Sequence, residues 1–402
     1  MGIDFNSELH ARPSIYFEGP SLVEHVALLP LPLALASQRH SPSVVVEADT
    51  SDVRTQIEHH TEFTTVTRVS PISSDAQRWP QSLATNTELA DLAGLQDGRL
   101  ICRIAIFVTG PARDELGPLL RELDFGDTAA SYVGGGAAQV CSDFRVRSDE
   151  TSRIVVFNKD LNPYRLGRMV RRLYEIETYR AMALLGLSDA KRVSASLAEF
   201  DARLVALTSR NLKTGALEHK SLLEDISLLS AQVISSTAET RNRFGATAAY
   251  AQIVDERIAE LREHHVPGFQ RYGIFITRRF KPAMRTCAAT SLRLEQLSHA
   301  TMHLLDLLQT RIQVEIEYQN ATQIQVMANR AATQLKIQRA VEGFSIIAIS
   351  YYLLNLIKEV AETLELAGQH VSPLIMLVSI PIVIFGVCLA VLRVKHALKT
   401  EP

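Results

Sequence analysis

The pattern of apolar and polar residues changes character near residue 160. Before that point, short runs rich in Val, Ile and Phe stand between polar segments, and Pro- and Ser-rich breaks separate the units, which is typical of strands in a mostly buried sheet. This pattern predicts a cytosolic α/β or α+β domain over 1–160. The predicted strands are 23–29, 62–69, 99–108, 137–146 and 153–159, and the predicted helices are 81–93 and 113–123.

After Pro163 the apolar positions follow a helical period almost throughout. Ser188 stands where it would cap a second helix, so we expect an antiparallel helical domain over 161–280 with helices at 165–187, 188–211, 214–241 and 246–265. From Lys281 the same period continues over a predicted stalk helix, 281–340, with no glycine before Gly343. Such a length exceeds that of an ordinary globular helix and indicates a coiled coil, a stalk or entry into a membrane.

Two apolar segments close the chain. Val371–Leu392 contains 22 residues without a charge, which is enough to cross a bilayer. Gly343–Ile357 has only 15, but it can span as the end of a longer helix because the flanking Arg339 and Lys358 can reach the interface. A buried cytosolic helix is the alternative for this first segment. The pair predicts a two-helix transmembrane hairpin over 341–395, with spans at about 341–358 and 371–392 and a loop near 358–372.

The distribution of charge around the hairpin predicts its orientation. Basic residues precede the first segment and follow the second (Arg330, Lys336, Arg339, Arg393, Lys395 and Lys399), whereas the connection carries Glu359, Glu362 and Glu365. Because positive charge favours the cytoplasmic side, both termini are expected in the cytoplasm. The sequence therefore predicts a multi-pass protein of a bacterial inner membrane, with an acidic outer loop.

Composition narrows the classes of function. The net charge of −2, with 21% charged residues, does not suggest a nucleic-acid-binding protein. The four cysteines are far apart and form no CxxC pair, which favours reduced thiols over a zinc site or a disulfide framework. No secretory signal peptide and no hydrolase signature is recognisable, so we expect no enzyme and no tightly bound cofactor.

One face of the first apolar helix carries polar groups. Residues three, four and seven apart share a helical face, and the stripe so defined contains Gln338, Glu342, Ser345, Ile349, Tyr352 and Glu359, with Asn355 beside it. A symmetric ring of such helices would present repeated oxygen groups to a cation, and Glu362 and Glu365 would raise the cation concentration at the mouth. The alternative is that small and polar residues serve only for helix packing.

Histidines of the first domain suggest a second kind of site. His10, His60 and Glu62 could converge on a metal or form a cytosolic regulatory site, although HHTE does not have the H-E-x-x-H spacing. The structural alternative is that His59 ends a helix and Glu62 begins a strand. The basic run Arg168, Arg171 and Arg172 is expected to be solvent- or lipid-facing.

Several motifs give the chain a specific resemblance. They are SELHARP at 7–13, HTEF at 60–63, EIETYR at 175–180, FGATAAY at 244–250, PAMRTC at 282–287 and VEGFS at 341–345, which continues through Tyr352. With these motifs the chain resembles a bacterial family of membrane-anchored proteins of unknown function that begin with an NELHARP-type motif. The likeness covers essentially the whole chain, and the family brings no established activity.

A weaker resemblance lies in the architecture. A cytosolic α/β domain, antiparallel helices, one very long helix and a two-span hairpin ending in basic residues are similar to the CorA-type cation transporters, which are pentamers whose first span lines the pore. The Gly-Met-Asn signature of those transporters is absent, and Asn355 is its only shared element.

Together these observations predict an α+β membrane protein with CorA-like architecture. We expect a homo-oligomer, a pentamer by the resemblance, that conducts cations and takes a divalent cation as substrate or regulator. One alternative is a membrane-anchored scaffold whose cytosolic domain binds an unknown partner. A third hypothesis is a membrane-anchored metalloenzyme that uses His10, His60 and Glu62.

Overall fold

The computed structural model describes residues 14–30, 44–47, 52–73, 79–80, 84–95, 98–112, 115–213, 215, 218–366 and 372–399. The chain forms two compact units, Met1–Asp306 and Leu307–Pro402, and each is described by itself. Predictions made for His10 and for the motif at 7–13 lie outside the described residues, as does the side chain of Glu365.

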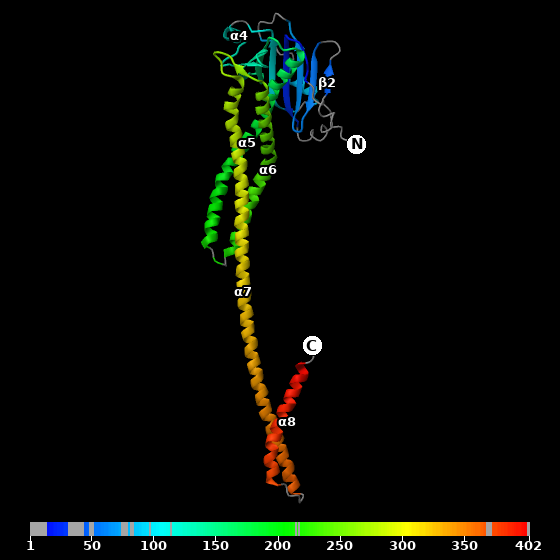
Figure 1. The fold of residues 1–402 in the computed structure, drawn as a ribbon, viewed down its shortest axis with the longest axis vertical. Helices are drawn as coiled ribbons and strands as arrows, with labels where there is room; N and C mark the ends of the chain where they lie inside the picture. The colour runs from blue at the N-terminus through cyan, green and yellow to red at the C-terminus, as the bar shows by residue number, and fades with distance from the viewer. Residues whose placement is uncertain are drawn as a thin grey trace. The chain divides into compact units, whose positions relative to one another are not determined.

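The first unit contains one mixed sheet, whose described strands have the order β2-β3-β4-β1-β5-β8-β7-β6-β9 (Figure 1). β5 and β8 are parallel, and every other pair of neighbouring strands is antiparallel. The strands are β1 Ser21–Leu29, β2 Val44–Glu47, β3 Arg54–His59, β4 Thr64–Pro71, β5 Arg99–Thr109, β6 Ala129–Val133, β7 Ala138–Val146, β8 Thr151–Asn158 and β9 His264–His265.

The centre of this sheet is covered on both faces. Every residue of β1 from Ser21 to Leu28 is buried, so side chains pointing to either face are removed from water. On one face β1, β5, β7 and β8 share a core with the start of α5. On the other face the same strands pack on α4, Leu116–Glu122. The expected mixed α+β fold with an N-terminal sheet domain is therefore confirmed.

The five predicted strands are present with small shifts, but β2, β3, β6 and β9 were not expected, and β9 lies where the end of a helix over 246–265 was predicted. One expectation is wrong: His59 ends strand β3, not a helix, and β4 begins at Thr64 rather than at Glu62. β3 reads RTQIEH, which alternates polar and apolar residues and pairs with β4 along its whole length. The predicted helix at 81–93 is shortened to α3, Asn86–Leu92, because Thr85 and Glu88 form a capping box at its start.

Long helices follow strand β8 in the chain. α5, Pro163–Lys213, and α6, His219–Glu260, pack against each other beyond the sheet (Figure 1). The predicted break at Ser188 is wrong, because its hydroxyl donates to the Leu185 carbonyl inside a continuous helix. The predicted break near Gly245 is also absent.

α7 runs from Tyr272 to Leu366 and so begins before the predicted Lys281. The backbone N–H of Tyr272 donates to the Ser131 hydroxyl at 2.9 Å. This tertiary contact fixes the first residue of α7, and the local sequence pattern does not predict it. Pro282 lies inside the first turns without ending the helix.

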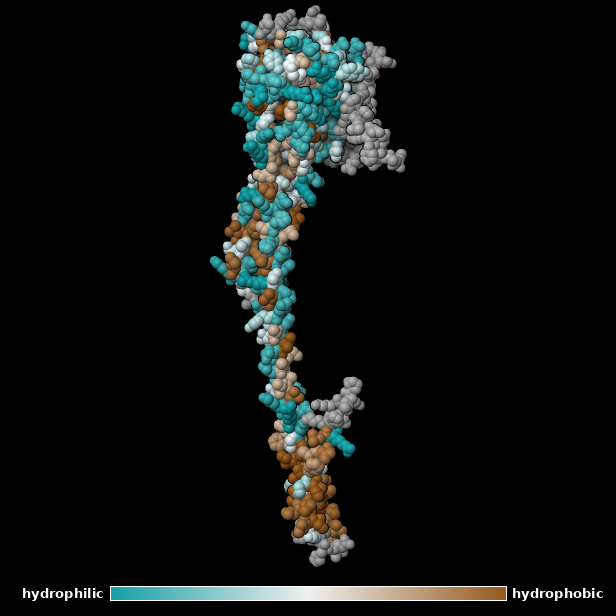
Figure 2. Space-filling model, in the orientation of Figure 1, coloured by the Kyte–Doolittle hydropathy of each residue, from teal (hydrophilic) through white to brown (hydrophobic). Residues whose placement is uncertain are grey.

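The second unit contains the remainder of α7 and α8, Pro373–Lys399. Ser350, Val383 and Val387 are buried, whereas most other side chains of both helices are exposed. Figure 2 shows apolar side chains gathered on α8 and the end of α7. Among the described helices, α7 and α8 each contain a stretch long and apolar enough to span a membrane.

Candidate functional site

Three of the sequence motifs, which lie far apart in the chain, meet beside the turn between β3 and β4. Phe63 of this turn makes edge contacts with Tyr179 of α5 and Tyr250 of α6, with ring centroids 6.0 and 6.1 Å apart. Tyr179 and Tyr250 stack on each other at 5.6 Å, and the His60 ring stacks on Phe63 at 4.3 Å. The aromatic side chains of HTEF, EIETYR and FGATAAY therefore form one cluster that joins the sheet to both helices.

Glu62 anchors this cluster to α6. Its carboxylate accepts hydrogen bonds from Arg243 Nη1 at 3.0 Å and from the Tyr250 hydroxyl at 3.2 Å. Burial and the neighbouring Glu62 carboxylate raise the pKa of Tyr250, so this hydroxyl stays protonated as a donor. Glu62 thus binds two groups of the same helix, as a structural contact would.

His25 of β1 lies under the same helices and is fully enclosed. Its Nδ1 is 2.8 Å from the Thr67 hydroxyl and its Nε2 is 3.0 Å from the Thr178 hydroxyl, while its ring stacks on Tyr174 at 4.2 Å. Burial, with His60 and Arg171 adding positive charge nearby, lowers the pKa of His25 to about 3. The ring is therefore neutral at physiological pH, with one nitrogen donating and the other accepting.

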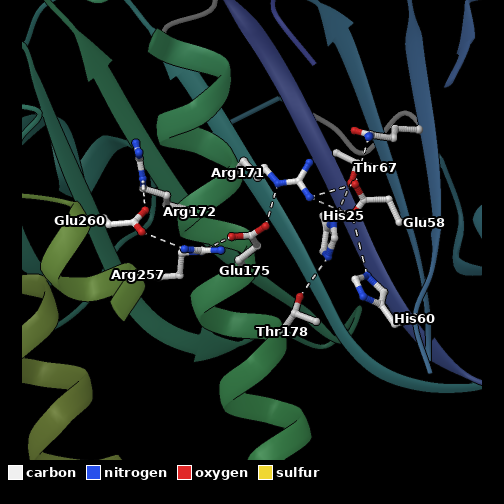
Figure 3. A network of polar contacts seen from close by, with 11 residues as sticks. His25, Glu58, His60, Thr67, Arg171, Arg172, Glu175, Thr178, Arg257 and Glu260 are labelled. Carbon is white, nitrogen blue, oxygen red and sulfur yellow. Dashed lines mark hydrogen bonds and ion pairs between the residues drawn. The ribbon is translucent and has the colours of Figure 1, made fainter. Parts of the chain in front are cut away.

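A chain of alternating charges crosses this region (Figure 3). Arg171 donates to both oxygens of Glu58 at 3.0 and 3.3 Å and to Glu175 at 2.7 Å. Arg257 of α6 binds Glu175 and Glu260, and Arg172 closes the chain on Glu260 at 2.7 Å. We call these six residues (Glu58, Arg171, Glu175, Arg257, Glu260 and Arg172) the ion-pair chain.

The expectation that Arg171 faces solvent or lipid is wrong. Its side chain is only 14% exposed, and that of Glu58 is 6% exposed. Burial by itself lowers the pKa of Arg171, but Tyr174, Glu58 and Glu175 around it raise that pKa above its usual value. The guanidinium therefore stays charged. The ion-pair chain links β3, α5 and α6, and it is buried at Glu58 and Arg171 but partly exposed at Arg172, Arg257 and Glu260.

Cys102, which lies beside this region, is not an activated thiol. Burial raises the pKa of Cys102 to about 12, although the Thr178 hydroxyl lies 3.7 Å from its sulfur. Such a thiol is not a nucleophile at neutral pH. His60 lies 3.8 Å from Glu58, whereas Glu62 binds Arg243, so the two residues proposed as metal ligands have separate partners. Among the described residues, no three His, Cys, Asp or Glu side chains are grouped to hold a metal ion.

The predicted polar stripe lies on α7 in the second unit. Gln338, Ser345, Ile349, Tyr352, Asn355 and Glu359 are exposed, and Glu342 is half-buried and accepts from Gln338 at 3.3 Å. A different face is covered, since Ile346, Leu354 and Ile357 are partly buried and Ser350 is buried. Most of the stripe therefore lies outside the covered face, with Glu342 at the edge between the two. Glu362 is exposed and pairs with Lys358 at 3.7 Å.

The fold and this site define a mixed α+β protein whose sheet domain is joined to long helices by an aromatic cluster and an ion-pair chain. A family model described as a protein of unknown function (DUF3422) matches residues 4–398. The chain belongs to this family. No curated protein and no solved structure matches the chain, so the likeness to CorA-type transporters rests on architecture alone.

Proposed function

We propose that this protein is a homo-oligomer of a bacterial inner membrane that conducts cations, with the first span lining the path. One observation carries the proposal. On the stripe of α7, Gln338, Ser345, Ile349 and Tyr352 are exposed and have no covering element among the described residues, and Glu342 is half-buried at the edge of the stripe.

The apolar surface of the hairpin supports its placement in a bilayer. Phe344, Ile347, Leu374 and Phe385 are each between 67% and 72% exposed, and the exposed apolar side chains continue along both helices. An apolar surface of this extent is unstable in water, whereas lipid tails cover it at no cost. The basic residues that flank the two segments favour a cytoplasmic location for both termini.

The same face of α7 supports self-association ahead of the membrane. Ile324, Met327 and Leu335 are 56% to 69% exposed and lie on the helical face that continues into Gln338 and Glu342. Exposed apolar side chains along one helix face favour a second helix of the same kind. A closed ring of these helices satisfies each copy equally, and a pentamer is the ring that the CorA-like architecture suggests.

In such a ring the polar stripe would face the axis. Polar groups at membrane depth are costly unless they face water or protein, and carboxylate, hydroxyl and amide oxygens are ligands for cations. Glu342, Ser345 and Asn355 would supply these oxygens, and Glu359 and Glu362 would attract cations to the outer end. The permeant species would be a metal cation, and the resemblance to CorA-type transporters suggests a divalent one.

A second candidate function has its own supporting observation. A groove of about 700 Å³ runs between α6 and α7 and is lined by FGATAAY and PAMRTC side chains, among them Phe244, Ala248 and Met284. This groove favours the membrane-anchored scaffold, whose cytosolic unit binds an unknown partner. The metalloenzyme hypothesis draws no comparable support from the described residues.

The oligomer is tested with a matched pair of variants. Met327→Asp places a carboxylate on the face that continues into the stripe, whereas Asn329→Asp places one on the opposite face of the same exposed turn. We expect Met327→Asp to break the oligomer in mild detergent and to abolish cation flux in liposomes, with Asn329→Asp retaining both. A monomeric wild-type protein, or flux no greater than that of empty liposomes, would refute the proposal. If replacing 341–392 by an unrelated hairpin leaves function intact, the scaffold is favoured.

A further inference from the structure

A small cavity in the first unit is lined mainly by arginines. It lies where the turn after β6, the start of α5 and the end of α6 meet, and its volume is about 250 Å³. Its floor is apolar, and its walls carry charge. The lining residues are Gly134, Leu161, Met169, Arg165, Arg168, Arg172, Arg262 and Glu260.

The charges around this cavity do not balance. Four guanidinium groups face one carboxylate, and Glu260 is already engaged by Arg172 at 2.7 Å and by Arg257 at 2.9 Å. Within the described part of the chain, no carboxylate is paired with Arg165, Arg168 or Arg262, and the side chain of Arg165 donates only to the Gly134 carbonyl, at 3.3 Å. Like charges held around one small volume repel each other, and a bound anion would relieve that repulsion.

The backbone holds these arginines in place. Arg165, Arg168 and Arg172 are three and seven residues apart on α5 and so share one face. Arg262 follows α6 with φ of +49°, in the left-handed region that costs a non-glycine residue about 1 kcal/mol. A left-handed residue is common directly after a helix C-terminus, and here it sets the direction in which the chain leaves α6.

Glycine brings the floor of the cavity close to Arg262. Gly134 has φ of +63°, and its N–H donates to the Leu261 carbonyl at 3.0 Å. A Cβ at this position would lie 3.3 Å from Met169 Cε, so a larger residue would intrude on the floor. The turn between β6 and β7 therefore fixes the chain segment that carries Arg262 against α5.

We propose that this cavity binds the phosphate group of a small anion. Arginine binds phosphate oxygens through paired N–H donors, and three unpaired guanidinium groups match a group with two or more negative charges. The volume is below the roughly 300–1,000 Å³ of sites that enclose a drug-sized ligand, which fits a phosphate or pyrophosphate group rather than a whole nucleotide. A long nucleic acid fits poorly, because the basic residues are confined to one cavity and the net charge is −2.

Binding at this site would reach the ion-pair chain. Arg172 lines the cavity and is also bound to Glu260, which Arg257 links to Glu175. An anion that attracts Arg172 would compete with Glu260 for the same guanidinium. Binding of a phosphorylated ligand would therefore change the ion pairs at the junction of sheet and helices. This proposal does not depend on cation transport.

Calorimetric titration of the full-length protein in mild detergent at about 50 mM salt tests the proposal, with inorganic pyrophosphate as the probe. Arg168→Ala and Arg262→Ala each remove an exposed guanidinium from the cavity, and Arg192→Ala removes one from α5 outside it. We expect saturable binding at one site, about tenfold weaker in each cavity variant, which corresponds to about 1.4 kcal/mol. The control should bind within twofold of wild type.

Two further titrations identify the source of the phosphate. Short-chain phosphatidic acid in the same micelles represents a lipid headgroup, and its affinity relative to pyrophosphate shows which of the two sources the site prefers. Equal binding by wild type and Arg168→Ala, or an equal loss in Arg192→Ala, would overturn the proposal. So would a single-stranded oligonucleotide that displaces pyrophosphate at lower concentration, because it would indicate a nucleic-acid surface.

Discussion

The junction between sheet and helices depends on the contact between Glu58 and Arg171. We predict that Arg171→Met destabilises the first unit strongly, although the methionine has a similar length and keeps the apolar stem packed. Glu175 retains Arg257 as a partner in this variant, whereas Glu58 loses both bonds that it accepts from Arg171. The substitution therefore leaves one buried carboxylate without its arginine partner.

The magnitude follows from burial and distance. The Glu58 side chain is 6% exposed, and the two charged groups are 3.0 Å apart, so their attraction at an effective dielectric of about 20 is about 5 kcal/mol. Part of this is offset by desolvation, and removing one member of a buried pair typically costs about 3–5 kcal/mol. Gln56 donates to Glu58 at 3.0 Å and keeps one of its bonds, which places the expected loss near 3 kcal/mol.

The single tryptophan of the chain provides the assay. Trp79 packs on Phe107 and Phe125 with centroids 6.0 and 5.8 Å apart, so its fluorescence reports unfolding of the sheet in urea. The matched control is Arg210→Met, which removes an exposed ion pair with Asp225 whose side chains are 44% and 48% exposed. Pairs of this kind are worth about 0.2–1 kcal/mol.

The double variant Glu58→Gln with Arg171→Met completes the test. Because no uncompensated charge remains, we expect it to recover most of the lost stability, with a coupling energy of about 2 kcal/mol. A loss in Arg171→Met no larger than that in Arg210→Met would refute the reasoning, as would a double variant less stable than Arg171→Met alone.

Two further predictions follow from the same unit. His25 has a folded pKa of about 3 against an unfolded value of about 6.5, so protons bind the unfolded chain more readily. The stability present above pH 6.5 is therefore lost as pH falls toward 3. Between pH 6.5 and 5 the loss should be about 1.6 kcal/mol by Trp79 fluorescence in urea, and a His25→Gln variant with the same slope would disprove it. The second prediction concerns two glycines. Gly186→Ala should destabilise the first unit by about 1–3 kcal/mol, because the new Cβ would overlap the Thr247 hydroxyl. Gly245→Ala on α6, where no described atom lies within 4 Å of the new Cβ, should stabilise the same unit by about 0.5–1 kcal/mol, and equal urea midpoints for the two variants would contradict this packing argument.

The outline of the fold could be read from local patterns. Period-2 runs such as 99–108, helical periods after Pro163 and the uncharged stretch 371–392 each specify their own backbone state, because the pattern of burial repeats within the element itself. Element ends were less predictable. α7 begins at Tyr272 because Ser131, a residue far away in sequence, accepts the N–H of its first residue.

The sequence motifs indicated which segments carry specific residues, but they did not show which side chains contact each other. HTEF, EIETYR and FGATAAY were visible in the chain, yet His60 and Glu62 suggested a metal site, and the structure gives Glu62 to Arg243 and Tyr250 instead. A glutamate looks the same in the sequence whether its carboxylate coordinates a metal ion or pairs with an arginine. The partner that decides between them lies 181 residues away.

The sequence alone therefore determined the mixed α+β class, the long helices and two segments apolar enough for a membrane, since these follow from the spacing of neighbouring side chains. Only the tertiary structure decided that Arg171 is buried on Glu58, 113 residues away, that His25 is enclosed and neutral, and that Arg262 joins three arginines of α5 around one cavity. The physical reason is that burial and electrostatic environment are properties of packed elements. A single side chain acquires them only when segments distant in the chain come into contact.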